Sequence, residues 1–450
     1  MGRRSVGGPR FLDPEFVPSV SRRPVGKCWR QSSPFAASCF RFQSPGVFSC
    51  LGHYMPEDSR QKLSRRELLN AFTIAGGAIC VGLDQILLPA PSLAQTRNSF
   101  AGGEMLEIVP FEREGSPPMD TAVGEELDGR LYSDLASATP EQPVTAVERF
   151  YIRTRASSLL REQDLQLIQL RGLTGAPLDL RVGDLRSQAR PMGRHLMECA
   201  GNTREGRFGL ISVADWTGIP LAEVLQRIPS IPKGARILVS GFDRYASQSA
   251  NSTAGASWIF SLDDIRATGA FLATDMDGQP LTRDHGAPVR LVVPGWYGCS
   301  CIKWLNEIRV VTDSVEITSQ MQEFAFRTMQ RGSPKLAREY QAPAIDQSAM
   351  VTRVEKWRVG ERIRYRLAGI MWGGMAPVKR LEIRFNPEEG YVSVDEFQQS
   401  ANDPWSFWSH SWSPTASGTY LIRLRVAAPA MQTRRLDMGF YVREVEISES

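Results

Sequence analysis

The hydrophobic pattern of the chain changes between residues 331 and 343, and this change restricts the possible folds more than any other feature. Beyond it, apolar and polar residues alternate with a period near two, as in strands whose successive side chains face opposite sides of a sheet. The alternating stretches are residues 362–367, 379–385, 418–426 and 436–447. Several such strands separated by Gly, Pro and Asn turns predict an antiparallel β-sandwich over residues 335–450.

The segment before the break mixes helix and strand patterns. Apolar residues within 221–228 follow the i, i+3, i+4, i+7 spacing of a helix face, whereas 235–240 and 289–293 are short β-rich runs bounded by Gly or Pro. The prolines between residues 95 and 145 indicate an irregular lead-in. We therefore expect an α+β domain over residues 95–330, followed by the all-β sandwich.

The distribution of charge argues against a nucleic-acid partner. The chain of 450 residues has a formal net charge of +4, but residues 1–66 hold 12 Lys and Arg against 4 Asp and Glu. The remainder is therefore mildly acidic and lacks the concentrated basic face that binds nucleic acid.

The basic N-terminal segment has the composition of an export signal. Arg65 and Arg66 precede an apolar stretch from Ala71 to Leu88, and small residues lead to Ala94. Paired arginines indicate the twin-arginine route, with residues 1–94 as the leader and a periplasmic destination. A membrane anchor is the alternative, but Asp84 and three glycines make the stretch a poor span. Residues 1–54 cannot bury a core, and Met55 is an alternative start.

Cys199 is the residue of greatest chemical interest downstream of this leader. The chain has seven cysteines, of which only Cys199, Cys299 and Cys301 follow residue 94. Most free cysteines are small buried hydrophobic residues. Gly201 and Asn202 nevertheless indicate a turn that exposes the side chain, and Arg204 would favour the thiolate that ligates soft metals or attacks substrates.

Four segments together resemble the sulfite oxidase family. Residues 199–204, Cys-Ala-Gly-Asn-Thr-Arg, are similar to the loop whose cysteine ligates molybdenum, and residues 277–305 are similar to the stretch that cradles the cofactor. Residues 150–155 resemble the arginine-bearing strand beside the metal, and 240–243 occupy the place of an aspartate that contacts the pterin. The C-terminal segment, with Trp405, Trp408, His410 and Trp412, resembles the family's immunoglobulin-like dimerisation domain.

The resemblance implies a molybdenum-molybdopterin cofactor with Cys199 as its protein ligand. It places Arg153 and Arg204 near the metal and substrate, as catalytic residues together with Cys199. Arginine suits these positions because its planar fork donates two hydrogen bonds to a phosphate or an oxyanion. The cofactor-binding positions that it implies are Tyr151, Ile152, Arg153, Thr154, Arg155, Cys199, Asp243, His285, Arg290, Cys301, Ile302 and Lys303.

Several of these residues have a simpler interpretation. Arg290 alternates with apolar neighbours and fits the solvated side of a strand, Arg155 fits a surface charge, and His285 fits a hydrogen-bonded turn histidine. Cys299 and Cys301 form a pair without further ligands, which falls short of a zinc site. Cys301 is then expected to be a neutral occupant of the cofactor wall.

The implied activity is oxidation of an inorganic or carrier-bound sulfur compound, of sulfite or sulfane type, by oxygen-atom transfer. The substrate would be a small anion, and a homodimer would form through the sandwich. Because the chain has no Cys-x-x-Cys-His, a separate c-type cytochrome is the expected electron acceptor. The family places a tyrosine near the metal where this chain has Phe324 in a Phe-Ala-Phe run ending at Phe326, which weakens the case for sulfite itself.

Three other functions remain open. A methionine-sulfoxide reductase of the same superfamily would share the export signal and the cysteine ligand. A non-catalytic binding or assembly protein with the same fold would have no need of the Cys199 thiolate. A cysteine hydrolase could use His285 as its base, although no carboxylate can be assigned to orient that histidine.

Overall fold

The computed structural model describes residues 100–125, 128–154, 165–242, 256–374, 378, 380–398, 404–426 and 431–448. The leader expected over residues 1–94, including Arg65, Arg66 and the alternative start Met55, lies outside the described residues. Arg155 and Asp243 also lie outside them. Within the described ranges no helix has the length and apolar character needed to cross a bilayer.

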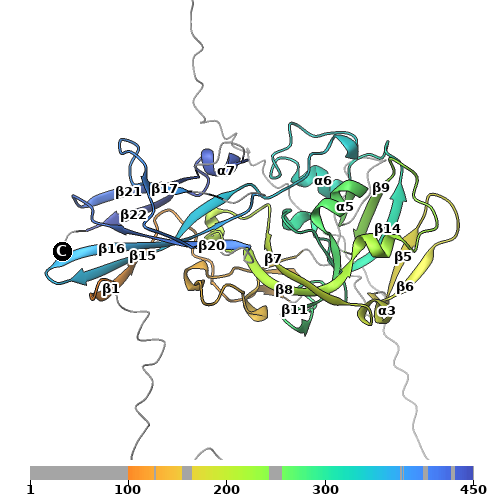
Figure 1. Ribbon diagram of the computed structural model, residues 1–450, viewed down its shortest axis with the longest axis horizontal. Helices are drawn as coiled ribbons and strands as arrows, with labels where there is room; N and C mark the ends of the chain where they lie inside the picture. The colour runs from red at the N-terminus through yellow and green to blue at the C-terminus, as the bar shows by residue number, and fades with distance from the viewer. Residues whose placement is uncertain are drawn as a thin grey trace, which may run out of the picture. The chain divides into compact units, whose positions relative to one another are not determined.

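Two sheets form the scaffold of the part that precedes the break (Figure 1). The first has the strand order β10-β9-β14-β5-β6 and the second the order β12-β11-β8-β7, with β13 paired to β11. The bounds are β5 Leu167–Arg171, β6 Leu178–Arg181, β7 Arg190–Glu198, β8 Ile211–Pro220, β9 Arg236–Gly241, β10 Ser257–Ser261, β11 Phe271–Met276, β12 Gln279–Pro280, β13 Arg290–Val292 and β14 Leu305–Val311. The runs predicted at 235–240 and 289–293 are therefore confirmed as β9 and β13.

Short helices connect these strands. They are α3 Val182–Arg186, α4 Leu221–Leu225, α5 Leu262–Thr268 and α6 Ser319–Phe324. Helix α4 confirms the amphipathic pattern that begins at Leu221, although it ends at Leu225 and only a turn continues to Ile228. A Ser261 capping box starts α5, because the Ser261 hydroxyl accepts from the Asp264 amide and the Asp264 carboxylate accepts from the Ser261 amide.

The lead-in contains more regular structure than the sequence suggests. Strand β1 Glu104–Val109 pairs antiparallel with β15 Ser348–Val359, from Glu104 beside Arg358 to Val109 beside Val354. The small sheet of β2 Val123–Glu125, β3 Asp128–Leu131 and β4 Ile152–Arg153 follows. The expectation of an irregular segment is wrong here, because β1 is an edge strand with mostly exposed side chains and is held by hydrogen bonds to a distant strand.

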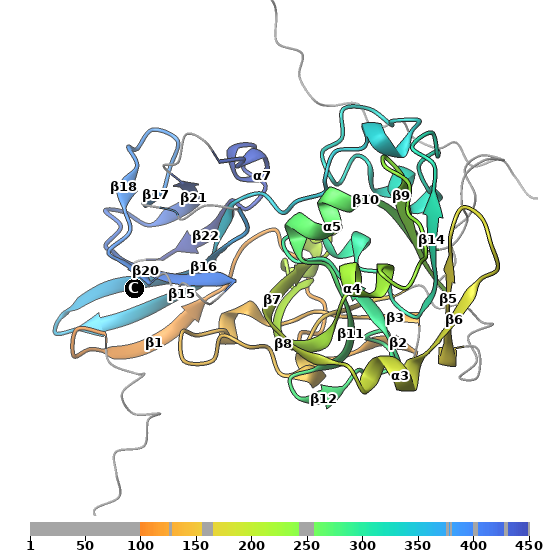
Figure 2. The same cartoon turned by 45° about the vertical axis from the view of Figure 1, so that its right-hand side comes forward.

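The C-terminal part consists of two antiparallel sheets (Figure 2). One has the order β1-β15-β16-β20-β19 and the other the order β18-β17-β21-β22. The remaining bounds are β16 Arg362–Trp372, β17 Leu381–Arg384, β18 Val392–Ser393, β19 Glu396–Gln398, β20 Trp405–Trp412, β21 Gly418–Val426 and β22 Arg443–Ile447. Aromatic rings pack between the two sheets. The centre of the Trp412 ring in β20 lies 4.3 Å from that of the stacked Phe385 ring and 4.7 Å from that of the Tyr420 ring in β21.

One predicted strand is only half correct. Within residues 436–447, the first residues belong to helix α7 Arg434–Asp437 and a following turn, and β22 begins at Arg443. Gly439 has φ of 74°, a left-handed conformation that ends the helix and does not fit an extended strand. The Leu436 side chain is buried although it lies in a helix, so its apolar character fitted the pattern of a buried strand residue equally well.

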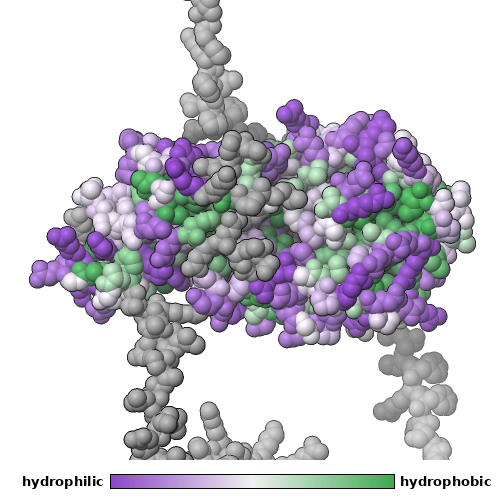
Figure 3. Space-filling view, viewed as in Figure 1, coloured by the Kyte–Doolittle hydropathy of each residue, from purple (hydrophilic) through white to green (hydrophobic). Residues whose placement is uncertain are grey.

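One large hydrophobic core runs through both parts of the described chain, beside a small second cluster around Leu165 and Trp304. Tyr441, which follows α7, contacts Phe208 at 5.5 Å and Trp372 of β16 at 5.2 Å, so residues from before and after the break share this core. Strand β1, which precedes the break, lies in a sheet of the C-terminal part. The face drawn in Figure 3 carries mainly hydrophilic side chains with scattered apolar ones between them.

Candidate active site

Cys199 follows directly after β7, at the turn that connects β7 to β8. Its amide donates to Leu210 O at 2.9 Å, and its carbonyl accepts from the Asn202 amide at 2.9 Å. The Gly201 amide lies 3.4 Å from Cys199 Sγ, within range of an N–H···S hydrogen bond. The turn predicted from Gly201 and Asn202 is therefore present. The side chain is only 8% exposed, however, and it faces a cavity rather than bulk solvent.

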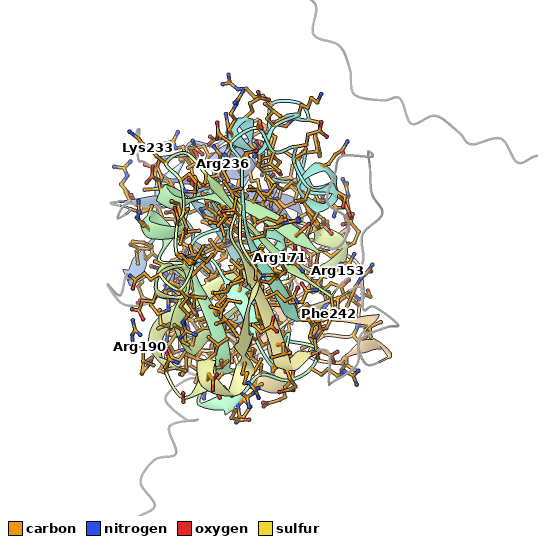
Figure 4. The ribbon with its side chains drawn as sticks, turned by 90° about the vertical axis from the view of Figure 1, so that its right-hand side faces the viewer. Arg153, Arg171, Arg190, Lys233, Arg236 and Phe242 are labelled. Carbon is orange, nitrogen blue, oxygen red and sulfur yellow. The ribbon has the colours of Figure 1, made fainter. Side chains whose placement is uncertain are left out.

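The cavity gathers residues from segments far apart in the sequence. Nine candidate site residues line it, and these are Tyr151, Ile152, Arg153, Cys199, His285, Arg290, Cys301, Ile302 and Lys303. Phe324, at the expected place of the family's tyrosine, also lines it, as do residues that the sequence did not assign to the site, among them Met197, Asp284, Cys299 and Gln320. In the view of Figure 4, Arg153 lies to the right and the exposed Arg190 to the left.

Arg290 is a buried cation on β13. Only 5% of it is exposed, so it does not occupy the solvated side of a strand. Its guanidinium donates to His285 O at 2.9 Å and lies 3.1 Å from Met197 Sδ, and no described carboxylate pairs with it. Burial lowers the pKa of Arg290 from its ordinary value, while Cys301 acts in the opposite direction. A buried cation without a counter-ion favours an anionic ligand nearby.

Lys303 links two walls of the cavity. Its ammonium donates to Asp284 O at 3.0 Å and to Arg153 O at 3.3 Å, and it lies 4.7 Å from the centre of the Trp304 ring. The ammonium therefore holds the arginine-bearing strand β4 against the loop before β13. A Cβ on Gly298 would lie 2.6 Å from the Tyr151 hydroxyl, so this close approach of the two walls requires glycine.

The cavity fits a polar, anionic group with a soft metal. Among the described residues that line the cavity, Arg290 has a buried Nε without a hydrogen-bond partner. Such orphaned groups are costly unless a ligand satisfies them. Cys199 offers a sulfur ligand in the same space. Thr154, which the sequence also assigns to the cofactor, is 2% exposed but is not among the residues that line the cavity.

Arg204 is not brought to this cavity. Its guanidinium donates to Val442 O at 2.9 Å, away from the lining of the cavity. Arg327, three residues after α6, lies near Cys199 instead. The position of a Cβ on Gly201 would be 3.2 Å from Arg327 Nη1 and 3.7 Å from Cys199 Sγ. Arg327 was not predicted as a site residue. The only feature of residues 322–327 that bore on the site was the absence of a tyrosine.

The electrostatics of Cys199 reflect these neighbours. Burial raises the pKa of the Cys199 thiol, whereas the Gly201 amide and the guanidinium groups of Arg153 and Arg327 lower it, with a net rise. Metal ligation needs the thiolate, so binding of a metal would release the proton. Burial also raises the pKa values of Cys299 and Cys301. No cluster of three or more His, Cys, Asp or Glu with metal-ligand geometry occurs in the described ranges.

The two phenylalanines of the 322–327 run have different environments. Phe324 is 8% exposed and lines the cavity, and the Arg327 guanidinium lies 5.5 Å from its ring centre. Phe326 is 89% exposed. Of the two, Phe324 is therefore the residue that presents an apolar ring where a hydroxyl-bearing side chain was expected.

His285 is held by the protein at both ring nitrogens. Nε2 lies 3.0 Å from Phe150 O and Nδ1 lies 2.7 Å from Thr282 Oγ1. This pattern fits a neutral ring that donates from Nε2 and accepts at Nδ1. Burial is the main reason that the pKa of His285 falls to about 4, and Arg290 and Lys303 lower it further. A general base needs a free nitrogen, so the geometry disfavours the hydrolase interpretation.

The buried neutral state of His285 predicts a pH effect on stability. Between pH 6.5 and about 4 the unfolded chain binds a proton at this position and the folded chain does not, so stability falls as the pH falls through this window. The expected contribution is about 3 kcal/mol. We expect His285→Gln to lose this part of the pH dependence when the free energy of unfolding is measured from pH 7 to 4. An identical pH profile in both proteins would contradict the neutral assignment.

Comparisons with known proteins agree with this geometry. The family described as "Oxidoreductase molybdopterin binding domain" matches residues 161–318. Mitochondrial sulfite oxidase of Homo sapiens is 30% identical over 231 residues, covering 46% of this chain and 41% of that protein. Residues 161–318 therefore carry a molybdopterin-binding oxidoreductase domain, and the chain is similar to this sulfite oxidase over 46% of its length. The cofactor of this domain is accordingly molybdenum-molybdopterin.

Other relatives extend the match in different directions. Sulfite oxidase of Gallus gallus is 27% identical over 314 residues, covering 64% of this chain and 66% of that protein. Nitrate reductase [NADPH] of Aspergillus niger is 30% identical over 197 residues, covering 40% of this chain and 22% of that protein. The chain thus spans less than half the length of several curated relatives that it matches.

A solved structure shares the fold over most of the chain. The crystal structure of the sulfane dehydrogenase SoxCD from Paracoccus pantotrophus superposes with a TM-score of 0.51 at 15% identity, covering 85% of this chain and 99% of that chain. This shared fold and the family match over residues 161–318 together confirm the predicted sulfite oxidase-type molybdopterin domain, with mostly β structure. The immunoglobulin-like identity of the C-terminal sandwich and the domain boundaries stay predictions.

Proposed function

We propose that this oxidoreductase oxidises a small anionic sulfur compound, inorganic or carrier-bound, by oxygen-atom transfer. The observation that carries the proposal is the pair of guanidinium groups, Arg153 and Arg327, that flank Cys199. Neither pairs with a described carboxylate, so both are available to an anion that approaches the site. Arginine binds such oxyanions through paired hydrogen bonds.

The residues of the cavity divide into those for the cofactor and those for the substrate. Cys199 would ligate molybdenum, and Arg290 and Lys303 would contact the anionic and polar parts of the pterin. When bound, the cofactor supplies oxygen-atom transfer and accepts two electrons. Arg153 and Arg327 would bind the substrate, orient its sulfur and offset the negative charge that accumulates during the reaction.

Phe324 supports a substrate other than free sulfite. An apolar ring in the cavity removes a hydrogen-bond donor and reduces the space available to water. A sulfane-type sulfur is less strongly hydrated than the oxygens of sulfite, so it would lose less on entering this cavity. We therefore place a sulfane or thiosulfate-type substrate ahead of sulfite.

The electrons and the destination of the protein complete the proposal. An oxygen atom of water ends on sulfur, and two electrons and two protons leave. A c-type cytochrome would accept the electrons singly, because the chain has no haem-attachment motif. We also propose export to the periplasm by the twin-arginine route, based on residues 64–94, and a homodimer formed through the C-terminal sheets.

A steady-state screen of protein matured in a molybdenum-replete host tests the proposal. The substrates are sulfite, thiosulfate, a sulfane carrier, methionine sulfoxide and nitrate, each with a cytochrome or dye as electron partner. We expect molybdenum near one atom per chain and the highest kcat/KM for an anionic sulfur donor. Turnover of methionine sulfoxide or nitrate alone would replace the proposal with a reductase, and absence of molybdenum would indicate a non-catalytic protein.

A further inference from the structure

Glu198, the residue directly before Cys199, carries a fully buried carboxylate. It ends β7 and is 0% exposed. Trp372 Nε1 donates to its Oε2 at 2.8 Å, and the Tyr441 hydroxyl donates to its Oε1 at 3.3 Å. Asn202 Nδ2 lies 3.4 Å from the same Oε1. Trp372 and Tyr441 belong to the C-terminal part, so the carboxylate beside the ligand turn is bound mainly from across the break.

Arg435 of α7 is the cation that faces this carboxylate. It is 4% exposed, and its Nη1 lies 3.7 Å from Glu198 Oε1, an ion-pair distance that is longer than a hydrogen bond. Its Nη2 donates to Ala200 O at 3.0 Å and to Arg327 O at 2.8 Å. The guanidinium also lies 4.5 Å from the centre of the Tyr297 ring. One side chain thus binds the turn after Cys199 and the segment that carries Arg327.

We infer that Arg435 is a positioning residue that fixes the Cys199 turn and the Arg327 segment relative to each other. The two segments are far apart in sequence, and the guanidinium donates to one carbonyl of each. Glu198 holds the guanidinium in place by its charge. Through Arg435, the C-terminal part then sets the distance between Cys199 as the metal ligand and Arg327 as the cation that binds the substrate. These roles of Cys199 and Arg327 rest on the proposed function.

Charge balance alone does not explain the arrangement. A buried ion pair is weak evidence for stability, since apolar residues of similar volume often serve as well. The hydrogen bonds to Ala200 O and Arg327 O both come from Nη2 and are not needed to neutralise Glu198, which faces Nη1. Two nitrogens of one planar guanidinium therefore serve the carbonyls and the carboxylate at the same time. Lysine would keep the charge and lose this geometry.

The test compares variants that separate charge from geometry. Arg435→Met leaves Glu198 buried without its cation, whereas the double variant Glu198→Gln with Arg435→Met removes both charges. Arg435→Lys keeps the charge. Arg434→Met is the matched control, because Arg434 precedes it on α7 and pairs with Asp346 at 2.7 Å. The readouts are the unfolding temperature and the rate of Cys199 alkylation in cofactor-free protein, resolved by peptide mass spectrometry with Cys299 and Cys301 as internal references.

We expect Arg435→Met to lower the unfolding temperature and to raise Cys199 alkylation relative to the two reference thiols. The increase should be roughly tenfold or more, as expected for local opening after loss of hydrogen bonds to a charged donor. The double variant should recover the unfolding temperature but keep the fast alkylation. Arg435→Lys should alkylate faster than wild type, and Arg434→Met should keep the wild-type ratio.

Wild-type alkylation in the double variant would overturn the inference, because it would show that charge balance is the whole role of Arg435. A wild-type ratio in Arg435→Lys would overturn it as well. If Arg435→Met does not fold, the double variant and Arg435→Lys carry the test. Alkylation is measured without cofactor or substrate, so failure of the proposed sulfur oxidation leaves this result unaffected, and failure here leaves the substrate screen unaffected.

Discussion

Replacing Cys199 with Ser is expected to abolish turnover of every sulfur substrate while leaving the fold intact. Serine is nearly isosteric, but its hydroxyl remains protonated at neutral pH and is a hard ligand, whereas the cysteine thiolate is soft. The measurements are kcat/KM with the best substrate of the screen, molybdenum content by mass spectrometry, and the unfolding temperature. Full activity in Cys199→Ser would disprove the assignment of the ligand.

Cys299→Ser is the matched control for this experiment. Cys299 lines the same cavity and is 7% exposed, close to the exposure of Cys199. It carries no proposed ligand role, so the variant should keep its molybdenum and most of its activity. Loss of molybdenum from Cys299→Ser together with retention in Cys199→Ser would exchange the two assignments.

Arg153→Gln and Arg327→Gln are expected to raise KM for an anionic sulfur substrate by roughly 10- to 100-fold each, the range for loss of one hydrogen bond to a charged group. A neutral sulfur compound should be affected far less, because it gains little from either cation. Glutamine keeps a donor and removes only the charge and the fork. Steady-state kinetics with both substrates checks the prediction, and equal effects on the two would contradict it.

Two further substitutions sharpen the comparison. Arg186→Gln removes the same charge from an exposed position on α3 and should leave KM unchanged. Arg204→Gln distinguishes the role that the sequence motif predicts for Arg204 from the role that the structure indicates. The motif predicts a substrate defect there, whereas the hydrogen bond to Val442 O predicts a change in stability without a change in selectivity between anionic and neutral substrates. A rise in KM for anionic but not for neutral substrates in Arg204→Gln would favour the role that the motif predicts.

Much of the cavity could be predicted because its residues come from contiguous motifs. Residues 150–153 and 285–303 each carry several lining side chains, and Cys199 lies in a short motif of its own, so local resemblances place these residues together. Local patterns also predicted β9, β13 and the alternation of β21, whose side chains alternate between buried and exposed. Arg155 and Asp243 have no placement among the described residues.

Errors arose where a tertiary contact overrides a local pattern. Strand β1 has exposed apolar residues and no clean alternation, and its pairing comes from β15. Residues 436–440 alternate like a strand but form the end of α7 and a turn, because Gly439 adopts a left-handed conformation. Arg290 alternates with apolar neighbours like a surface residue, yet strand β13 is buried.

Local features of the sequence were enough to indicate the cofactor of this protein. The thiol at Cys199, the cations of the motifs and the two hydrophobic periods are local properties, and they were sufficient to predict the molybdopterin-binding domain and its cofactor. Which cations lie near the thiol depends instead on contacts between distant segments. Arg204 turns to Val442, Arg327 takes a place beside Gly201, and Arg435 binds both segments from α7. These contacts join residues more than a hundred positions apart, and no local pattern encodes such a separation.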